Sequence, residues 1–187
     1  MYPQDQNRDA AIIDLYWQRD EQAIHETTHY YGPLCMRVAM NILDNHADAE
    51  ECVNDAYLKA WNSIPPARPR VLAAFLTRIT RNLALDRFRA RHREKRDSHV
   101  TVMLSELSDC IPAPEETDTG ALVAHINAFL RQQDELDRNL FVGRYFHAYE
   151  VKKMAASYGM TPNAVSLRLH KTRERLRAHL NERGYHV

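Results

Sequence analysis

The stretch that decides the fold is VKKMAASYGMTPNAVSLRLHKTRERLRAHL, residues 151–180. A short helical pattern ends at Gly159, and glycine can adopt the left-handed conformation that a helix exit requires. Thr161 then offers its hydroxyl as an N-cap, and Pro162 takes the first helical position, where its missing N–H is no loss. Four residues of the second helix recur at helical spacing and are expected to face inward: Val165, Leu169, Thr172 and Leu176.

The two predicted helices form a helix–turn–helix, whose second helix would enter the major groove of DNA. The residues expected to face outward are Asn163, Ser166, Leu167, His170 and Lys171. Positive charge near the phosphates would come from Arg168, Lys171, Arg173, Arg175 and Arg177. The alternative is a helical hairpin whose basic side chains are only solvated.

Composition and charge extend this interpretation to the whole chain. The 187 residues suffice for one large or two small domains, and the small number of glycines, five, favours a mostly helical class. The net charge of zero hides a segregated pattern. Residues 1–62 hold 4 basic and 11 acidic side chains, and residues 63–96 hold 10 basic and 2 acidic ones. Residues 97–119 hold 6 acidic side chains and no basic ones, and residues 120–187 hold 11 basic and 6 acidic ones. Two basic blocks separated by an acidic one suggest two nucleic-acid contacts on a tether.

The cysteines and the hydropathy pattern bear on the compartment. Cys35, Cys52 and Cys110 are odd in number and form no CxxC pair, which fits unpaired thiols in a reducing cytosol. The N-terminus is acidic and polar rather than a signal peptide, and no apolar run is long enough to span a bilayer. A cytoplasmic location without stable membrane insertion is therefore expected.

The helical patterns predict an all-α protein of two small helical domains joined by a flexible acidic linker. Helices are expected over residues 9–43, with a kink or break at Gly32-Pro33, and over 48–61 and 71–93. The stretch 97–119 has no sustained periodicity, and helical patterning resumes at Ala121. The predicted domains are residues 1–96, a linker at 97–120, and residues 121–187.

One motif points to a different chemistry. The run His25-Glu26-Thr27-Thr28-His29 fits the HExxH pattern of zinc hydrolases, with Glu50 at a distance where a third ligand could lie. The alternative is two surface imidazoles on an amphipathic helix, which we favour because Ala23, Tyr30 and Leu34 already form a packing stripe beside them. No other catalytic constellation is present, so we expect no enzyme activity, no metal and no cofactor.

Four segments in order resemble an extracytoplasmic-function (ECF) sigma factor of bacterial RNA polymerase. They are YYGPLCMRVAMNIL at 30–43, DAEECVNDAYLKAW at 48–61, FLTRITRNLALDRFRARHR at 75–93, and the block 140–177 that contains the helix–turn–helix. The resemblance implies that the first domain, sigma region 2, binds the β′ clamp helices of core polymerase and opens the −10 promoter element. It implies that the second, sigma region 4, reads the −35 element and touches the β flap. An anti-sigma protein, common in the family, is expected as a further partner.

The resemblance assigns roles to residues of the first domain. The acidic side of the helix 48–61 would contact polymerase through Glu50, Glu51, Asn54 and Asp55; the alternative is a solvated acidic face. The melted −10 strand would be held by Arg68, Arg70, Arg78, Arg81 and Asn82. The duplex phosphates just upstream would be gripped by Arg87, Arg89, Arg91 and Arg93. An alternative for Asn82 is a side-chain bond to Asp86 one helical turn away.

In the second domain the resemblance places the −35 element against Thr161, Asn163, Ser166, Leu167, Arg168, Lys171, Arg173 and Arg175. Ser166 replaces a residue that is usually basic in the family, and Leu167 one that is usually small and polar, so the −35 sequence read can differ from the common one. The acidic linker resembles the segment that threads through the polymerase channel, with a passive tether as the alternative. The rival to the whole interpretation is a stand-alone helix–turn–helix regulator whose first domain dimerises or senses a ligand.

Overall fold

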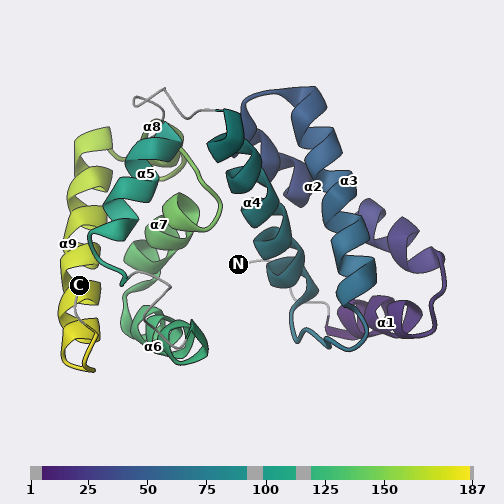
Figure 1. Ribbon diagram of the computed structural model, residues 1–187. Coiled ribbons are helices and arrows are strands. Elements are labelled where there is room, and N and C mark those ends of the chain that lie inside the picture. Colours follow the sequence, from purple (N-terminus) through teal and green to yellow (C-terminus); the bar gives the residue numbers. More distant parts are fainter. Residues whose placement is uncertain (1–5, 92–98, 113–118, 186–187) are drawn as a thin grey trace. The chain divides into compact units, whose positions relative to one another are not determined.

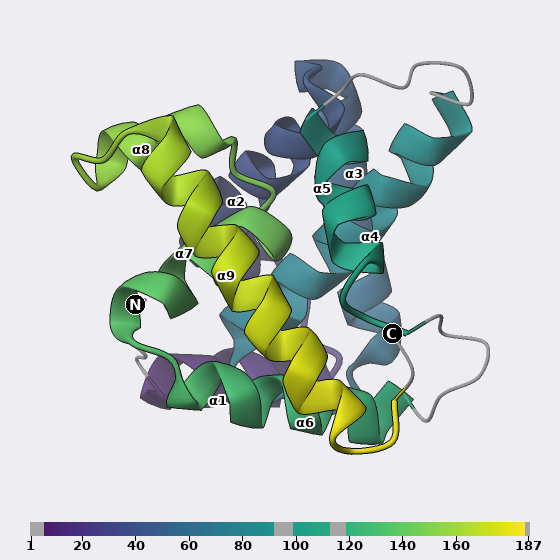
Figure 2. The same ribbon diagram turned by 90° about the vertical axis from the view of Figure 1, so that its left-hand side faces the viewer.

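The structure is a computed structural model, and it describes residues 6–91, 99–112 and 119–185. These residues form helices and connecting turns, without strands in the described ranges (Figures 1 and 2). The chain divides into two compact units, Met1–Glu94 and Lys95–Val187, each considered by itself. The helices are α1 (Gln6–Trp17), α2 (Gln22–Leu43), α3 (His46–Ser63), α4 (Leu72–Arg91), α5 (His99–Ser108), α6 (Thr119–Gln132), α7 (Glu135–Tyr145), α8 (Val151–Ser157) and α9 (Pro162–Asn181).

In the N-terminal unit, α2, α3 and α4 pack against one another and α1 packs on α2. Each helix contributes one apolar face to the shared core, as its spacing predicts. Examples are Val38 and Ile42 of α2, Val53 of α3, and Leu76 of α4, all buried. Gly32 allows α2 and α3 to approach closely, because a Cβ atom there would lie 3.1 Å from the hydroxyl oxygen of Tyr57.

A buried carboxylate ties α1 to the start of α4. Asp9 is buried, and its Oδ2 accepts a hydrogen bond of 2.8 Å from the backbone N–H of Leu72. Leu72 is the first residue of α4, where N–H groups lack an intrahelical partner, so Asp9 caps this helix from a different part of the chain. The hydroxyl of Tyr31 donates to the other carboxylate oxygen of Asp9.

The predicted break in the first helical segment lies elsewhere. Pro33 is inside α2, and the chain reverses instead between Trp17 and Gln22. There Arg19 has a left-handed φ of 57°, and Asp20 accepts a hydrogen bond of 2.9 Å from the N–H of Gln22. An aspartate that satisfies an unpaired N–H at a helix start accounts for a new helix at this point.

The helix–turn–helix of the C-terminal unit is confirmed. Gly159 has a left-handed φ of 62°, and the Thr161 hydroxyl oxygen accepts a hydrogen bond of 3.2 Å from the N–H of Ala164. Pro162 opens α9 as predicted. The four residues expected to face inward are all buried: Val165, Leu169, Thr172 and Leu176.

The prediction of a flexible linker over 97–120 is wrong for residues 99–108, which form α5. Val100 and Met103 are buried, and Cys110 just beyond the helix is buried too. These residues and Leu107 lie at helical spacing, so the segment has a short apolar stripe that packs on α7. Acidic residues and prolines in the second half of the segment obscured this stripe. Residues 92–98 and 113–118 lie outside the described residues.

None of the helices in the described ranges has both the length and the apolar character that crossing a bilayer requires.

Candidate nucleic-acid and partner interfaces

The outer side of α3 carries the predicted acidic face. The helix starts where the Asn45 side chain accepts a hydrogen bond of 3.1 Å from the N–H of Asp48. Small and apolar residues then turn inward at helical spacing. This leaves Glu50, Glu51 and Asn54 exposed and Asp55 partly exposed, as predicted.

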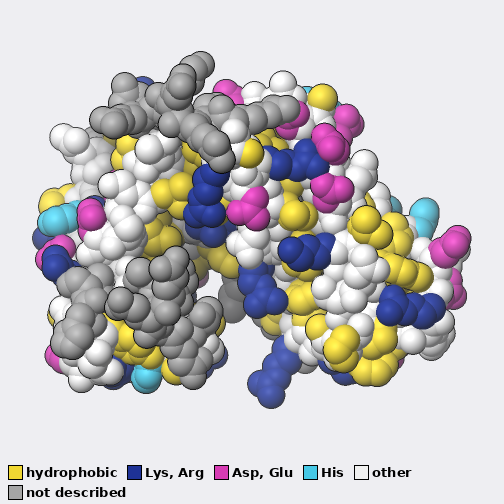
Figure 3. Space-filling view, in the orientation of Figure 1, with side chains coloured by type: hydrophobic (Ala, Val, Ile, Leu, Met, Phe, Trp, Pro, Cys, Tyr) yellow, Lys and Arg dark blue, Asp and Glu magenta, His cyan; other side chains and the backbone are white. Residues whose placement is uncertain are grey.

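Arg87 of α4 holds two of these carboxylates. Its Nη1 lies 2.9 Å from Oε2 of Glu51, and its Nη2 lies 2.5 Å from Oδ2 of Asp55. The hydrogen bond and the charge of Arg87 lower the pKa of Glu51, and the bond to Glu51 raises the pKa of Arg87. Figure 3 shows basic side chains beside acidic ones over α3 and α4. The Arg87 guanidinium is therefore engaged by two carboxylates within the unit, and its side chain is only 26% exposed. Its contact with DNA phosphates stays a prediction.

An apolar side chain that the sequence analysis missed joins the acidic face. Leu58 is 60% exposed, although every other large residue of α3 at apolar spacing turns inward. It follows Asn54 by four residues and Glu51 by seven, so the three share one face. Glu50 lies beside them, and its Oε2 is 3.5 Å from Nδ1 of His46. The sequence alone could have predicted this exposure, because Leu58 lies outside the helical spacing of the α3 residues that turn inward.

The loop before α4 carries two of the predicted −10 arginines. Arg68 pairs with Asp14, and its guanidinium lies 5.6 Å from the ring centroid of Trp17. Arg70 is exposed and makes no ion pair with the residues that the structure describes. The loop is anchored by Ile64, which is fully buried. Trp17, which the sequence analysis did not assign, is 42% exposed beside this loop.

The predicted contacts on α4 differ in exposure. Arg78 and Asn82 are exposed one turn apart, and the Arg78 guanidinium lies 5.6 Å from the Phe75 ring centroid. Arg81 is half-buried, its Nε lacks a hydrogen-bond partner, and burial with the nearby Arg89 lowers its pKa. Arg89 is exposed and pairs with Asp86 over 3.4 Å, so Asp86 has a partner other than Asn82. The side chain of Arg91, and all of Arg93, lie outside the described residues.

In the C-terminal unit, one buried carboxylate engages two predicted −35 arginines. Oδ1 of Asp137 lies 2.7 Å from Nη1 of Arg168, and its Oδ2 lies 2.6 Å from Nη2 of Arg175. Burial acts to raise the pKa of Asp137, but the two arginines outweigh it and the pKa is lowered. Both guanidinium groups are therefore drawn toward α7, and each keeps part of its surface exposed.

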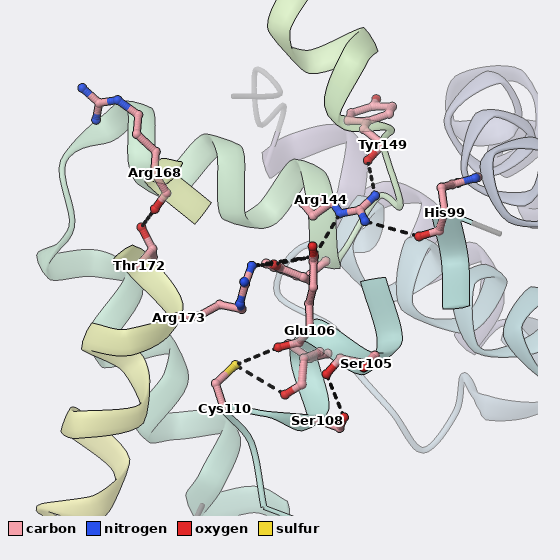
Figure 4. Close-up of polar contacts among 12 residues, drawn as sticks. His99, Ser105, Glu106, Ser108, Cys110, Arg144, Tyr149, Arg168, Thr172 and Arg173 are labelled. Atoms are coloured by element: carbon pink, nitrogen blue, oxygen red, sulfur yellow. Dashed lines mark hydrogen bonds and ion pairs between the residues drawn. The ribbon is translucent and has the colours of Figure 1, made fainter. Parts of the chain in front are cut away.

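Arg173 makes its contacts within the C-terminal unit. Its Nη1 donates to the Tyr145 hydroxyl over 2.6 Å and lies 3.7 Å from Oε2 of Glu106 (Figure 4). Only 16% of its side chain is exposed. The Arg173 guanidinium thus joins α9 to α5 and α7, and its contact with DNA stays a prediction.

The predicted duplex-reading face at the start of α9 is exposed. Asn163, Ser166, Leu167 and Lys171 are exposed, as predicted, and Thr161 is exposed but also serves as the N-cap. Lys171 makes no ion pair with any described residue. The first acidic residue of the helix is Glu174, so this face presents no negative charge over residues 162–173.

The HExxH motif gains no third ligand. His25 and His29 are exposed on α2, where His25 lies 3.7 Å from Glu26 and His29 packs edge-on against Tyr30. Tyr30 is exposed beneath the Arg8 guanidinium rather than in the core, which corrects its predicted packing role. Among the described residues, no three His, Cys, Asp or Glu side chains are grouped to hold a metal ion.

Comparison with known proteins identifies the family. Residues 28–94 match the family model of sigma-70 region 2. The ECF RNA polymerase sigma factor SigE of Mycolicibacterium smegmatis (strain ATCC 700084 / mc(2)155) is 26% identical over 186 residues, covering 95% of this chain and 70% of that protein. This chain is an ECF sigma factor. It is thus a promoter-specificity factor of RNA polymerase. The region 2 match covers α3 and α4 of this sigma factor, and with them the acidic candidate residues of α3 and the −10 candidate residues of the loop and α4.

Two solved structures are also similar to this sigma factor. CnrH in complex with the cytosolic domain of CnrY shares 20% identity at a TM-score of 0.44, covering 94% of this chain and 98% of that one. The sigma factor RpoE in complex with the anti-sigma factor NepR from Bartonella quintana shares 20% identity at a TM-score of 0.37, covering 84% and 96%.

Proposed function

We propose that three surfaces of this sigma factor divide the work of initiation. The outer side of α3 docks on core polymerase, the loop at 64–70 with the exposed side of α4 holds the melted −10 strand, and the start of α9 reads the −35 duplex. The observation that carries this proposal is the opposite charge of the outward surfaces. The exposed side of α3 is acidic, whereas the exposed residues of the loop and of early α9 are basic or uncharged.

The polymerase surface combines charge with an apolar contact. Glu50 and Glu51 supply the negative charge that steers encounter with a basic partner, and Leu58 supplies area that is removed from water on docking. Arg87 holds Glu51 and Asp55 in one geometry before any partner arrives, which reduces the entropy lost on binding.

The −10 surface combines exposed cations with aromatic rings. A separated strand is held by a basic groove and by flat side chains on which bases stack. Arg70 and Arg78 offer the charge, Asn82 offers hydrogen bonds to a base edge, and Trp17 lies exposed beside Arg68. Arg89 is exposed for phosphates despite its long pair with Asp86.

The two DNA-reading surfaces belong to separate compact units of one chain. Joining two weak readers raises the effective concentration of the second once the first is bound. Neither unit therefore needs to bind DNA tightly alone. We further propose, on the family resemblance, that the protein acts in the cytoplasm without catalytic activity and that an anti-sigma protein holds it inactive by covering these surfaces.

The test is transcription in vitro with purified core polymerase and a library of promoter sequences, with and without the full chain. We expect start sites that appear only with the chain, upstream of which two dissimilar elements lie at fixed spacing. Failure to bind core polymerase, or binding without new start sites, would overturn the proposal. Palindromic sites bound without polymerase would support the stand-alone regulator instead.

Variants separate the surfaces. Glu50→Lys and Leu58→Ala are expected to weaken association with core polymerase at least five-fold, and Arg70→Ala to leave it unchanged while reducing promoter opening. Val123→Ala, a similarly exposed apolar change on α6, is the matched control for Leu58→Ala. Equal effects of all these changes on polymerase binding would contradict the division of surfaces.

A further inference from the structure

The start of α9 exposes a large apolar side chain. Leu167 is 54% exposed, whereas Val165 and Leu169 on either side of it are buried in the unit. The helix begins at Pro162 behind the Thr161 cap, so Leu167 lies in its second turn. In a helix–turn–helix this part of the second helix is the part that meets base edges.

The neighbours of Leu167 define what could cover it. Asn163 and Lys171 lie four residues before and after Leu167, and His170 lies three after, so all share its outward face and all are exposed. The absence of acidic residues over 162–173 makes this face compatible with a polyanion. A nucleic-acid duplex therefore fits the surroundings of Leu167 better than a basic protein surface does.

The arginines that would normally read guanine nearby are partly withdrawn. Arg168 is paired with Asp137, and Arg173 with Glu106 and Tyr145. Bidentate guanidinium contacts to base edges compete with these internal pairs. The contacts left at the centre of the face are the Leu167 side chain and the polar groups that flank it.

The chemistry of the major groove then selects the partner of Leu167. The C5-methyl group of thymine is the apolar group that the bases present there, and apolar side chains contact it. We propose that Leu167 contacts the methyl group of a thymine in the −35 element and makes that position thymine-selective. The inference rests on the proposed function, in which α9 reads the −35 duplex.

The test uses the change of one methyl group. Once library transcription has given the −35 element, each thymine on either strand is replaced singly by deoxyuridine, which lacks only that methyl. Initiation by the holoenzyme and its affinity for the duplex are measured. For the native chain we expect about a four-fold loss at one or two adjacent positions, the effect of burying one methyl-sized group.

Replacement of the side chain should abolish this sensitivity. In Leu167→Ala and Leu167→Ser the ratio between thymine and deoxyuridine templates is expected to fall to about one at the same positions, by the loss of the methyl contact. Val123→Ala on α6 should keep the native ratio. Because Leu167 is exposed, we expect the thermal midpoint and helical circular dichroism of its variants to match those of the native chain.

The remaining outcomes overturn the proposal in distinguishable ways. Suppose that initiation by the native chain is unchanged by every deoxyuridine but is still reduced by changes of whole base pairs in the element. This result refutes the methyl contact and leaves the proposed function standing. Equal sensitivity in the native chain and in Leu167→Ala assigns the methyl to another residue. Loss of core-polymerase binding in Leu167→Ala assigns the apolar contact to protein. Insensitivity to every base-pair change refutes the reading of the element by α9, and with it the proposed function.

Discussion

Glu106 of α5 lies 3.4 Å from the guanidinium Nε of Arg144 on α7, and only 3% of the Arg144 side chain is exposed. The same carboxylate accepts a hydrogen bond of 2.9 Å from the Tyr145 hydroxyl. Arg144 also donates to the backbone oxygens of His99 and Tyr149, each over 3.3 Å. A buried cation is tolerated when it is paired and hydrogen-bonded, so α5 is an integral part of the C-terminal unit.

Glu106→Gln should therefore destabilise the C-terminal unit. The change leaves the Arg144 charge buried without a counter-ion, and we expect a loss of about 2–3 kcal/mol in the free energy of unfolding. This is less than breaking a fully buried ion pair costs, because Glu106 is itself partly exposed. Denaturant unfolding, monitored by hydrogen exchange of the amides of α5, α7 and α9, measures this loss of stability. Glu182→Gln, at a mostly exposed pair with Arg183, is the control and should change stability by less than about 0.5 kcal/mol. Equal effects of the two changes would refute the role given to Glu106.

Asp137 predicts a pH dependence of the same unit. Its pKa is lowered in the folded chain, so its stabilising contribution is present above the pKa of the unfolded chain, about 3.9, and is lost as the pH falls through the folded value. Asp137→Asn should cost about 3 kcal/mol at pH 7 and flatten the loss of stability below pH 4. Unfolding curves from pH 7 to pH 2 measure both effects. A variant with the native slope in acid would contradict this assignment.

Asp9 should be needed for the start of α4. Asp9→Ala removes the acceptor for the Leu72 N–H in a buried position, and we expect a loss of about 2 kcal/mol in the N-terminal unit. Hydrogen exchange of the Leu72 amide is the direct measurement and should accelerate at least ten-fold. Asp86→Ala, which removes an exposed carboxylate from the same helix, should leave that amide protected. Unchanged Leu72 exchange in Asp9→Ala would rule out the cap.

Lys171 and Arg173 should separate DNA binding from folding. Lys171→Ala is expected to leave the thermal midpoint unchanged, weaken holoenzyme binding to promoters, and lower the slope of log affinity against log salt by about one. Arg173→Ala is expected to lower the thermal midpoint by several degrees, because Glu106 and Tyr145 each lose one of their partners. The reverse pattern, with Arg173 governing the salt slope and Lys171 the stability, would contradict the placement of both side chains.

Local rules explain which parts of the fold were predictable. The turn before α9 follows from Gly159, Thr161 and Pro162, each of which acts on neighbouring backbone groups. The acidic side of α3 follows from helical periodicity alone. The same kind of reasoning misplaced the break near Pro33, because it could not weigh a proline in an exposed helical position against the turn stabilised by Asp20.

The parts that were missed depend on distant partners. Asp137 and Arg168 are 31 residues apart, and Asp9 and Leu72 are 63 apart. Such pairings form when helices pack, and spacing within one helix does not reveal them. For that reason the arginines of α9 were predicted as equivalent DNA contacts. In the structure Arg173 pairs with Glu106, and Arg168 and Arg175 both pair with Asp137.

The position of the two indole rings gives this chain a label-free optical reporter. Trp17 and Trp61 are its only tryptophans, and both lie in the N-terminal unit. Trp17 is the more exposed and faces Arg68 across 5.6 Å, at the loop that leads into α4. Tryptophan emission of the isolated chain, excited where tyrosine does not absorb, therefore reports on the N-terminal unit alone. Single-stranded bases that stack near this loop would quench it.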